Sequence, residues 1–149
     1  MPRARSKLFP TPDDAETAFY DAFERADVAA MMAVWAESDD VVCVHPQGPR
    51  LVGFDAVRES WMQIFAAGAQ LRVSTTEHRS FDGQALAVHN VIELVTPAGS
   101  DQSPVTTVYA TNVFVLTEGG WRMAVHHANV SQEPPAQPRE EASQPHTLH

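Results

Sequence analysis

The sequence predicts an α+β domain in which three helices pack on one face of a curved, mainly antiparallel sheet. Apolar residues recur at helical spacing through the first half of the chain, and from Gln70 onward they alternate with period two. Helices followed by a run of strands are typical of α+β domains, whose helices gather on one side of the sheet. With 149 residues and 44% hydrophobic content, the chain suits one domain with a substantial core and a cone-shaped interior.

The first half predicts three helices in order. The first begins at Asp13 and repeats apolar residues at Ala15, Ala18, Phe19, Ala22 and Phe23. The second spans Val28 to Ala36, and Asp27 is a good N-cap for it. The third follows Gly53, with Asp55 as its candidate cap and Gly68 as its end, and its buried face carries Val57, Trp61, Ile64 and Phe65.

The strands are predicted from apolar runs and turn residues. Val41 to His45 is a short strand after the second helix, and Leu51-Val52 is too short for more than an edge strand. Two Gly-containing turns, Asp82-Gly83 and Gly119-Gly120, are typical of hairpins. They separate four long strands at about 70–81, 84–96, 104–117 and 121–130.

Composition sets the domain limits and excludes some partners. Residues 13–131 are expected to form the domain, residues 1–12 a flexible N-terminal arm, and the proline-rich residues 132–149 a disordered tail. The net charge of −9 argues against nucleic acid as a partner, because an acidic surface repels phosphates. No apolar run is long enough to cross a bilayer and none follows the basic first residues, so we expect a cytoplasmic protein with no membrane partner.

Alternation along the strands predicts a partly polar cavity under the helices. Each apolar stripe is interrupted by a polar residue: Asn90 among Leu86 to Leu94, Asn112 among Val108 to Leu116, and His127 among Trp121 to Asn129. An unpaired buried amide costs about 1–3 kcal/mol, so such residues usually satisfy a partner. We therefore expect these stripes to line the cavity.

The opposite faces of these strands are also largely apolar, which predicts a homodimer packed through the outer face of the sheet. Scattered surface aliphatic residues are the alternative explanation. The residues assigned to this outer face are Ala85, Ala87, His89, Val91 and Val95 on one strand and Val105, Tyr109, Val113 and Val115 on the next.

Several segments together resemble a known superfamily. They are Ala15–Asp27, Val34-Trp35-Ala36-Glu37, Cys43-Val44-His45-Pro46, Leu51 to Val57 with Trp61, Thr111-Asn112-Val113-Phe114, and Gly120 to Met123 with His126-His127. Over about residues 13–131 the chain is similar to the nuclear transport factor 2 superfamily and, within it, to bacterial SnoaL-like proteins. The resemblance implies a cone-shaped, cystatin-like roll that is commonly dimeric. Relatives include ketosteroid isomerases, polyketide cyclases, scytalone dehydratase and the association domain of calcium/calmodulin-dependent kinases, so the fold alone does not name a reaction.

The resemblance also suggests individual roles. In the ketosteroid isomerases the general base is an aspartate before a proline at the end of the first strand, and His45 before Pro46 holds that position here. The oxyanion tyrosine of those enzymes aligns with Phe19, and Tyr20 lies one residue away. Asn90 and Asn112 fall near arginine positions of the kinase association domain, so its charged cavity is not reproduced and no kinase link follows.

Each candidate side chain has a functional and a structural interpretation. His45, the strongest candidate, is either a general base near neutral pH or a histidine bonded to a backbone carbonyl. His127 either orients a ligand with His45 or pairs with a core asparagine. Asn90 and Asn112 either donate to an oxyanion or form a buried amide network. Trp61 and Tyr20 are expected at the walls or mouth, although aromatic residues at helical spacing are more often plain core.

The histidines lack the local spacing of metal ligands, since adjacent strand residues such as His126 and His127 point to opposite faces, so we expect no metal and no cofactor. The leading hypothesis is a pocket for a small apolar molecule, with cofactor-free isomerase-, cyclase- or dehydratase-type proton transfer on a carbonyl compound. The alternative hypothesis is a non-catalytic ligand-binding or dimeric assembly module.

Overall fold

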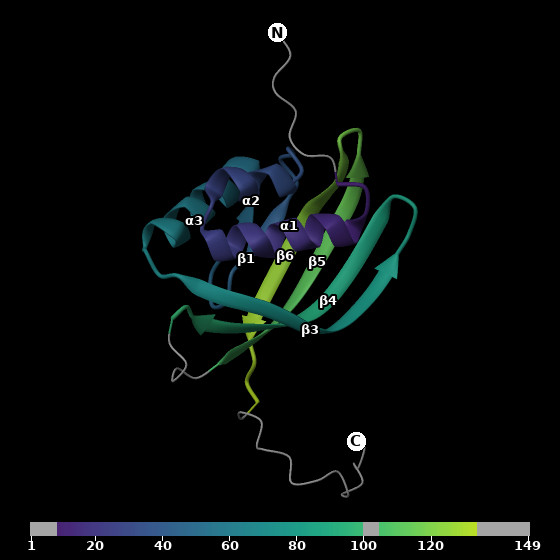
Figure 1. The fold of residues 1–149 in the computed structure, drawn as a ribbon. Helices are drawn as coiled ribbons and strands as arrows, with labels where there is room; N and C mark the ends of the chain where they lie inside the picture. The colour runs from purple at the N-terminus through teal and green to yellow at the C-terminus, as the bar shows by residue number, and fades with distance from the viewer. Residues whose placement is uncertain (1–8, 100–104, 134–149) are drawn as a thin grey trace, which may run out of the picture.

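Three helices lie across the concave side of one strongly curved sheet (Figure 1). The computed structural model describes residues 9–99 and 105–133. The expectations for residues 1–8 and 134–149, which are most of the predicted arm and tail, lie outside this range. The helices are α1 (Pro12–Arg25), α2 (Val28–Val34) and α3 (Phe54–Ala66). The strands are β1 (Val42–Val44), β2 (Arg50–Val52), β3 (Leu71–Asp82), β4 (Leu86–Pro97), β5 (Thr106–Thr117) and β6 (Gly120–Val130).

The six strands form one sheet in the order β2-β1-β6-β5-β4-β3. Every neighbouring pair is antiparallel except β1 and β6, which run parallel. This arrangement confirms the predicted α+β class and the mainly antiparallel sheet, and it places the short strand β2 at an edge as expected. Among the described helices, none is both long and apolar enough to span a membrane.

The helix ends follow local chemistry, with two differences from expectation. Asp27 caps α2 as predicted, because its carboxylate accepts the Ala30 amide at 2.9 Å. That helix ends at Val34 rather than Ala36, since Trp35 is extended and forms a bridge with Met123. The residue before α3 is Gly53 at φ +101°, so Asp55 lies inside the first turn and is not the cap.

The register of the sheet decides which strand faces meet the helices. Strand β5 buries Val108, Ala110, Asn112 and Phe114, as the stripe predicted. Residues directly opposite each other on paired strands share a face, and the β4 partners of this set are Glu93, Val91, His89 and Ala87. The prediction for β4 is therefore wrong by one residue: Asn90 is exposed, whereas His89 and Glu93 are buried.

A bulge in β6 reverses the alternation along that strand. Val125 pairs with Val113 and Met123 pairs with Phe114, which leaves Ala124 as an extra residue. Uniform alternation from Trp121 placed His127 inside the molecule. With the extra residue, His126 becomes buried and His127 becomes exposed, so the predicted position of His127 is wrong.

The core lies between the helices and the concave face of the sheet. Its largest fully buried side chains are Trp35, Trp61, Phe19, Phe114, Met31 and Met123. The convex face also carries apolar side chains, and none of the described helices covers it. Among them are the half-buried Val88, Ile92, Leu94, Tyr109 and Val113 and the exposed Leu86.

Candidate functional site

A cavity of about 280 Å³ opens between α1, α3 and the sheet. Most of its wall is apolar, with Phe23, Trp61, Ile64, Leu71, Val95 and Val108 among the lining residues. Four polar side chains also line it: His45 from the segment after β1, Glu93 from β4, Thr106 from the start of β5 and His126 from β6. A small apolar volume with a few convergent polar groups is typical of a small-molecule site.

His126 is almost completely enclosed, with 2% of its surface exposed. Its Nδ1 lies 2.7 Å from the Oδ1 atom of Asn112 on the neighbouring strand. Because that amide oxygen only accepts hydrogen bonds, Nδ1 donates and Nε2 carries the lone pair. Nε2 makes no hydrogen bond with any residue in the described ranges. Burial, together with the nearby His45 and His127, lowers the pKa of His126 to about 3, so the ring is neutral near pH 7.

Glu93 is a carboxyl group inside the core, only 3% exposed. The Tyr20 hydroxyl donates to its Oε2 at 2.7 Å. Burial, and to a lesser degree the nearby Glu16, raise the pKa of Glu93 to about 7, although the Tyr20 bond opposes this shift. The pKa of Tyr20 is itself raised, chiefly by burial and then by Glu93, so the phenol keeps its proton. Glu93 therefore holds a proton near neutral pH far more readily than an ordinary carboxyl.

His89 anchors the far end of the polar interior. Its Nδ1 lies 3.0 Å from Glu16 and its Nε2 lies 2.9 Å from Asp82. Burial disfavours the charged ring, but the bonds to these two carboxylates outweigh burial and raise the pKa of His89. Ligand atoms of Asp13, Glu16 and His89 lie within 4.8 Å of one another, close enough to surround a cation. Since both ring nitrogens of His89 already donate to carboxylates, the cluster is satisfied as an ion pair.

His45 lies on the cavity wall, with its ring 4.7 Å from that of Trp61 in an edge-to-face contact. The Ser60 hydroxyl donates to the Val57 carbonyl at 2.7 Å, so Ser60 accepts a hydrogen bond from His45 Nε2 at 2.9 Å. The Cys43 sulfur also lies nearer to Nε2, at 3.6 Å, than to the remaining nitrogen Nδ1, at 4.0 Å. Burial lowers the pKa of His45 to about 4, which also makes this ring neutral at pH 7.

Two buried indole groups remain unsatisfied in the described part of the chain. The Nε1 atoms of Trp35 and Trp61 are enclosed and have no hydrogen-bond partner there. Trp61 lines the cavity that contains the histidines, but its Nε1 is itself enclosed and is not offered to a molecule in the cavity.

The structure brings together only part of the predicted site. His45 and Trp61 line the cavity, whereas Tyr20 and Asn112 lie behind its wall and contact Glu93 and His126. Asn90 instead donates to Thr111 at 3.0 Å. As described above, His127 is exposed outside the core.

Sequence reasoning missed Glu93, His126, His89 and Glu16. The first three lie on strand faces that point inward because the predicted orientation of β4 and of the end of β6 was wrong by one residue. Glu16 had a usable signal, because it lies three residues before Phe19, on the helix face that is buried.

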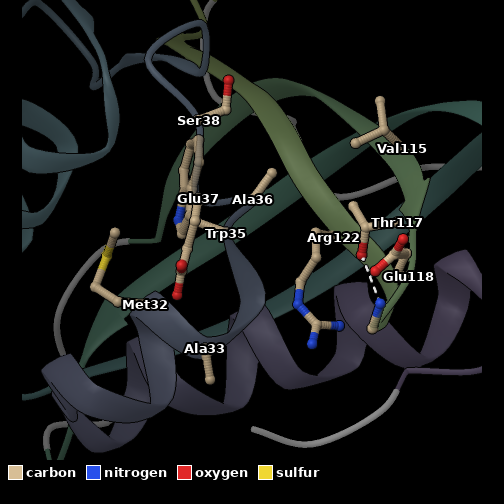
Figure 2. Close-up of a pocket in the computed structure, with 11 residues that line it drawn as sticks. Met32, Ala33, Trp35, Ala36, Glu37, Ser38, Val115, Thr117, Glu118 and Arg122 are labelled. Atoms are coloured by element: carbon tan, nitrogen blue, oxygen red, sulfur yellow. Dashed lines mark hydrogen bonds between the residues drawn. The ribbon is translucent and has the colours of Figure 1, made fainter. Parts of the chain in front are cut away.

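A second cavity, of about 500 Å³, lies between the segment that follows α2 and the β5–β6 hairpin. Figure 2 shows the Arg122 guanidinium on one side of it and Trp35 with Glu37 on the other. Arg122 also lies over the Phe9 ring, 5.0 Å from its centroid. The two cavities share no lining residue, and the histidines and Glu93 belong to the smaller one. The buried titratable groups therefore gather at the smaller cavity.

Comparisons with known proteins agree with this architecture. A profile of the SnoaL-like domain matches residues 13–131. The F-box protein SKIP8 of Arabidopsis thaliana is 28% identical over 116 residues, which are 76% of this chain and 47% of that protein. The chain thus spans about half the length of that curated relative.

Two solved structures are similar in both sequence and fold. A protein from Thiobacillus denitrificans, called a calcium/calmodulin-dependent protein kinase type II association domain, is 38% identical with a TM-score of 0.75; the match covers 84% of this chain and 98% of that one. A protein from Streptomyces avermitilis, called a dehydratase of the NTF2-like family, is 29% identical with a TM-score of 0.71, covering 80% and 93%. Taken with the profile match, these likenesses show that the chain belongs to the SnoaL-like domain family of the nuclear transport factor 2 superfamily.

Proposed function

We propose that the cavity binds a small, mainly apolar carbonyl compound and catalyses cofactor-free proton transfer on it, of isomerase, cyclase or dehydratase type. The observation that supports this most is that Glu93 and His126 line the same cavity. Burial moves the pKa of the carboxyl up to about 7 and that of the imidazole down to about 3. Groups whose environments push their pKa values apart in this way are suited to act as acid and base.

The proposed chemistry assigns one role to each group. His126 Nε2 takes a proton from the carbon next to the ligand carbonyl, and the electron pair of that C–H bond moves towards the carbonyl oxygen. Protonated Glu93 donates to that oxygen, which becomes an enol. In a dehydration the enol O–H returns its proton to Glu93 as the carbonyl re-forms and the β-hydroxyl group leaves, and the proton that His126 took from carbon passes to that hydroxyl to make water. Each such proton transfer is worth about 10²–10⁴-fold in rate.

The remaining residues support these two groups in the proposal. His45 is the second candidate base, because its neutral ring lines the same cavity. We rank it below His126 because its Nε2 is bonded to Ser60 and the Cys43 sulfur lies within 4.0 Å of both its nitrogens. Trp61 forms the wall, while Tyr20 and Asn112 hold the acid and the base in place. The name of the dehydratase from Streptomyces avermitilis is consistent with chemistry of this kind.

The test uses proton exchange, which needs no knowledge of the natural substrate. Wild-type protein is incubated in D₂O with a panel of uncharged cyclic ketones, and α-deuteration is followed by NMR. His126→Gln is expected to lower the catalysed exchange rate by about 10²–10⁴-fold. His127→Gln is the matched control, since the adjacent histidine points out of the core, and it should exchange like wild type. Equal rates for wild type and His126→Gln would refute the assignment.

Self-association is a second candidate function, supported by a different surface. The convex face of the sheet carries Val88, Ile92, Tyr109 and Val113 with no described helix over them. An apolar face of this kind is suited to packing against a second copy of the chain. The name of the association domain from Thiobacillus denitrificans points the same way. Sedimentation of wild type and of a Val113→Glu variant tests this proposal, as set out in the Discussion.

A further inference from the structure

The hydrogen bonds behind the cavity determine which nitrogen of His126 carries the proton. Asn112 has two N–H groups, and Nδ2 donates to Glu16 Oε2 at 2.8 Å and to the Tyr20 hydroxyl at 3.1 Å. Both donors are thereby engaged, and the amide oxygen is left facing His126 Nδ1 at 2.7 Å. That oxygen requires a proton on Nδ1, which leaves the lone pair on Nε2.

Glu16 prevents the amide from turning over. A reversed Asn112 would point its oxygen at the Glu16 carboxylate, setting two acceptors against each other without a proton. Glu16 cannot move aside easily, because its other oxygen accepts from His89 Nδ1 at 3.0 Å and His89 is held in turn by Asp82. Asn112 and His89 are at most 1% exposed, so water does not compete for these bonds.

The same network orients the acid. The Tyr20 hydroxyl accepts a hydrogen bond from Asn112 and donates one to Glu93 Oε2. The proton of a neutral Glu93 must then lie on Oε1. The network consequently leaves His126 Nε2 as a hydrogen-bond acceptor and protonated Glu93 as a donor, on a cavity wall that also carries the neutral His45 ring and the Thr106 hydroxyl. The residues that line the cavity include no lysine or arginine that could neutralise an anion.

We propose that Asn112 is a positioning residue that keeps His126 as a hydrogen-bond acceptor. The cavity then selects uncharged ligands that carry a hydroxyl donor, such as phenols, enols and hydroxyketones, over carboxylates. This inference rests on the proposed function for its ligand site. The role of Asn112 itself is a property of the ligand-free protein. The two parts are therefore measured separately.

The first experiment reads the tautomer directly. Two-bond ¹H–¹⁵N correlation spectra of the full-length protein at pH 6.5 should show His126 protonated on Nδ1 alone. Asn112→Leu removes the acceptor, and the proton is expected to move to Nε2, the form that free neutral imidazole prefers. Asn90→Leu makes the same change on the neighbouring strand, on the outer face, and should leave His126 unchanged. An Nε2-protonated His126 in wild type overturns the proposal, even if Asn112→Leu does not fold.

The second experiment measures ligand class with three compounds of one shape: p-cresol, 4-methylanisole and 4-methylbenzoate. Wild type should bind p-cresol about tenfold more tightly than either of the others, because only p-cresol is uncharged and can donate to Nε2. Asn112→Leu should lose the preference for p-cresol over 4-methylanisole. Equal or tighter binding of the benzoate overturns the ligand class. Failure of all three to bind overturns the ligand class and counts against the proposed function, whereas the tautomer measurement still decides the role of Asn112.

Discussion

Replacing Glu93 by glutamine should stabilise the protein at alkaline pH while removing its proposed acid. The side chain is 3% exposed, and burial raises its pKa from 4.5 to about 7. Between these two values the folded protein keeps a proton that the unfolded chain has released. Wild type therefore loses free energy of unfolding as pH rises through this window, at about 1.4 kcal/mol per pH unit and about 3 kcal/mol in all. Glutamine has no proton to lose and can still accept from Tyr20.

The assay is urea unfolding of wild type and Glu93→Gln at several pH values from 4 to 8. The variant should gain about 3 kcal/mol relative to wild type between the acidic and alkaline ends of this range. Glu118→Gln, on an exposed turn, is the matched control and should follow wild type throughout. A difference between wild type and Glu93→Gln that stays constant from pH 4 to pH 8 would show that Glu93 is ionised like a surface carboxylate, and the reasoning would fail.

Three further predictions concern other parts of the molecule. His89→Gln should lose about 3 kcal/mol of unfolding free energy at pH 5, because buried Glu16 loses its charged partner and keeps only the bond from Asn112. Unfolding curves should show this loss shrinking as pH rises through the elevated pKa of His89, since the ion pair stabilises wild type only while the ring is charged. A loss independent of pH would contradict this. Val113→Glu should convert the proposed dimer to monomer in sedimentation runs, whereas the control Gln63→Glu, on the exposed face of α3, should stay dimeric. A monomeric wild type would exclude the dimer. Native Cys43, whose pKa burial raises to about 12, should resist iodoacetamide at pH 8 and react only after unfolding, so rapid labelling of folded protein would show that the thiol is accessible.

Hydrophobic periodicity predicted the elements of this fold well and the faces of its strands less well. The helix around Phe19, the cap at Asp27 and the two Gly-containing hairpins follow from local chemistry that neighbouring residues fully specify. Strand β4 is different, because its two faces are about equally apolar. The buried face is the one that carries His89 and Glu93, and these polar groups are stabilised there by partners on α1 that no local pattern reveals.

The prediction of the buried face of strand β6 was wrong for another reason. The adjacency of His126 and His127 shows that only one of them can face the core, and the choice depends on whether Ala124 is paired. A bulge at a small residue leaves no signal in the spacing of apolar residues. Asn112 was predicted on the correct face because burial alternates regularly along β5. Its hydrogen bonds with Glu16, Tyr20 and His126 could not be predicted, because these partners lie far away in the sequence or on the misassigned face of β6.

The central claim is that one cavity is lined by a Glu93 carboxyl that keeps its proton to near neutral pH and a His126 ring that stays uncharged. A single pH titration of the ligand-free protein tests it, with the Glu93 carboxyl carbon and the His126 ring nitrogens followed by NMR from pH 3 to pH 9. The account predicts a midpoint near 7 for Glu93 and a His126 ring that stays neutral down to about pH 4 or below. A Glu93 midpoint near 4.5, together with a His126 midpoint near 6.5, would contradict it.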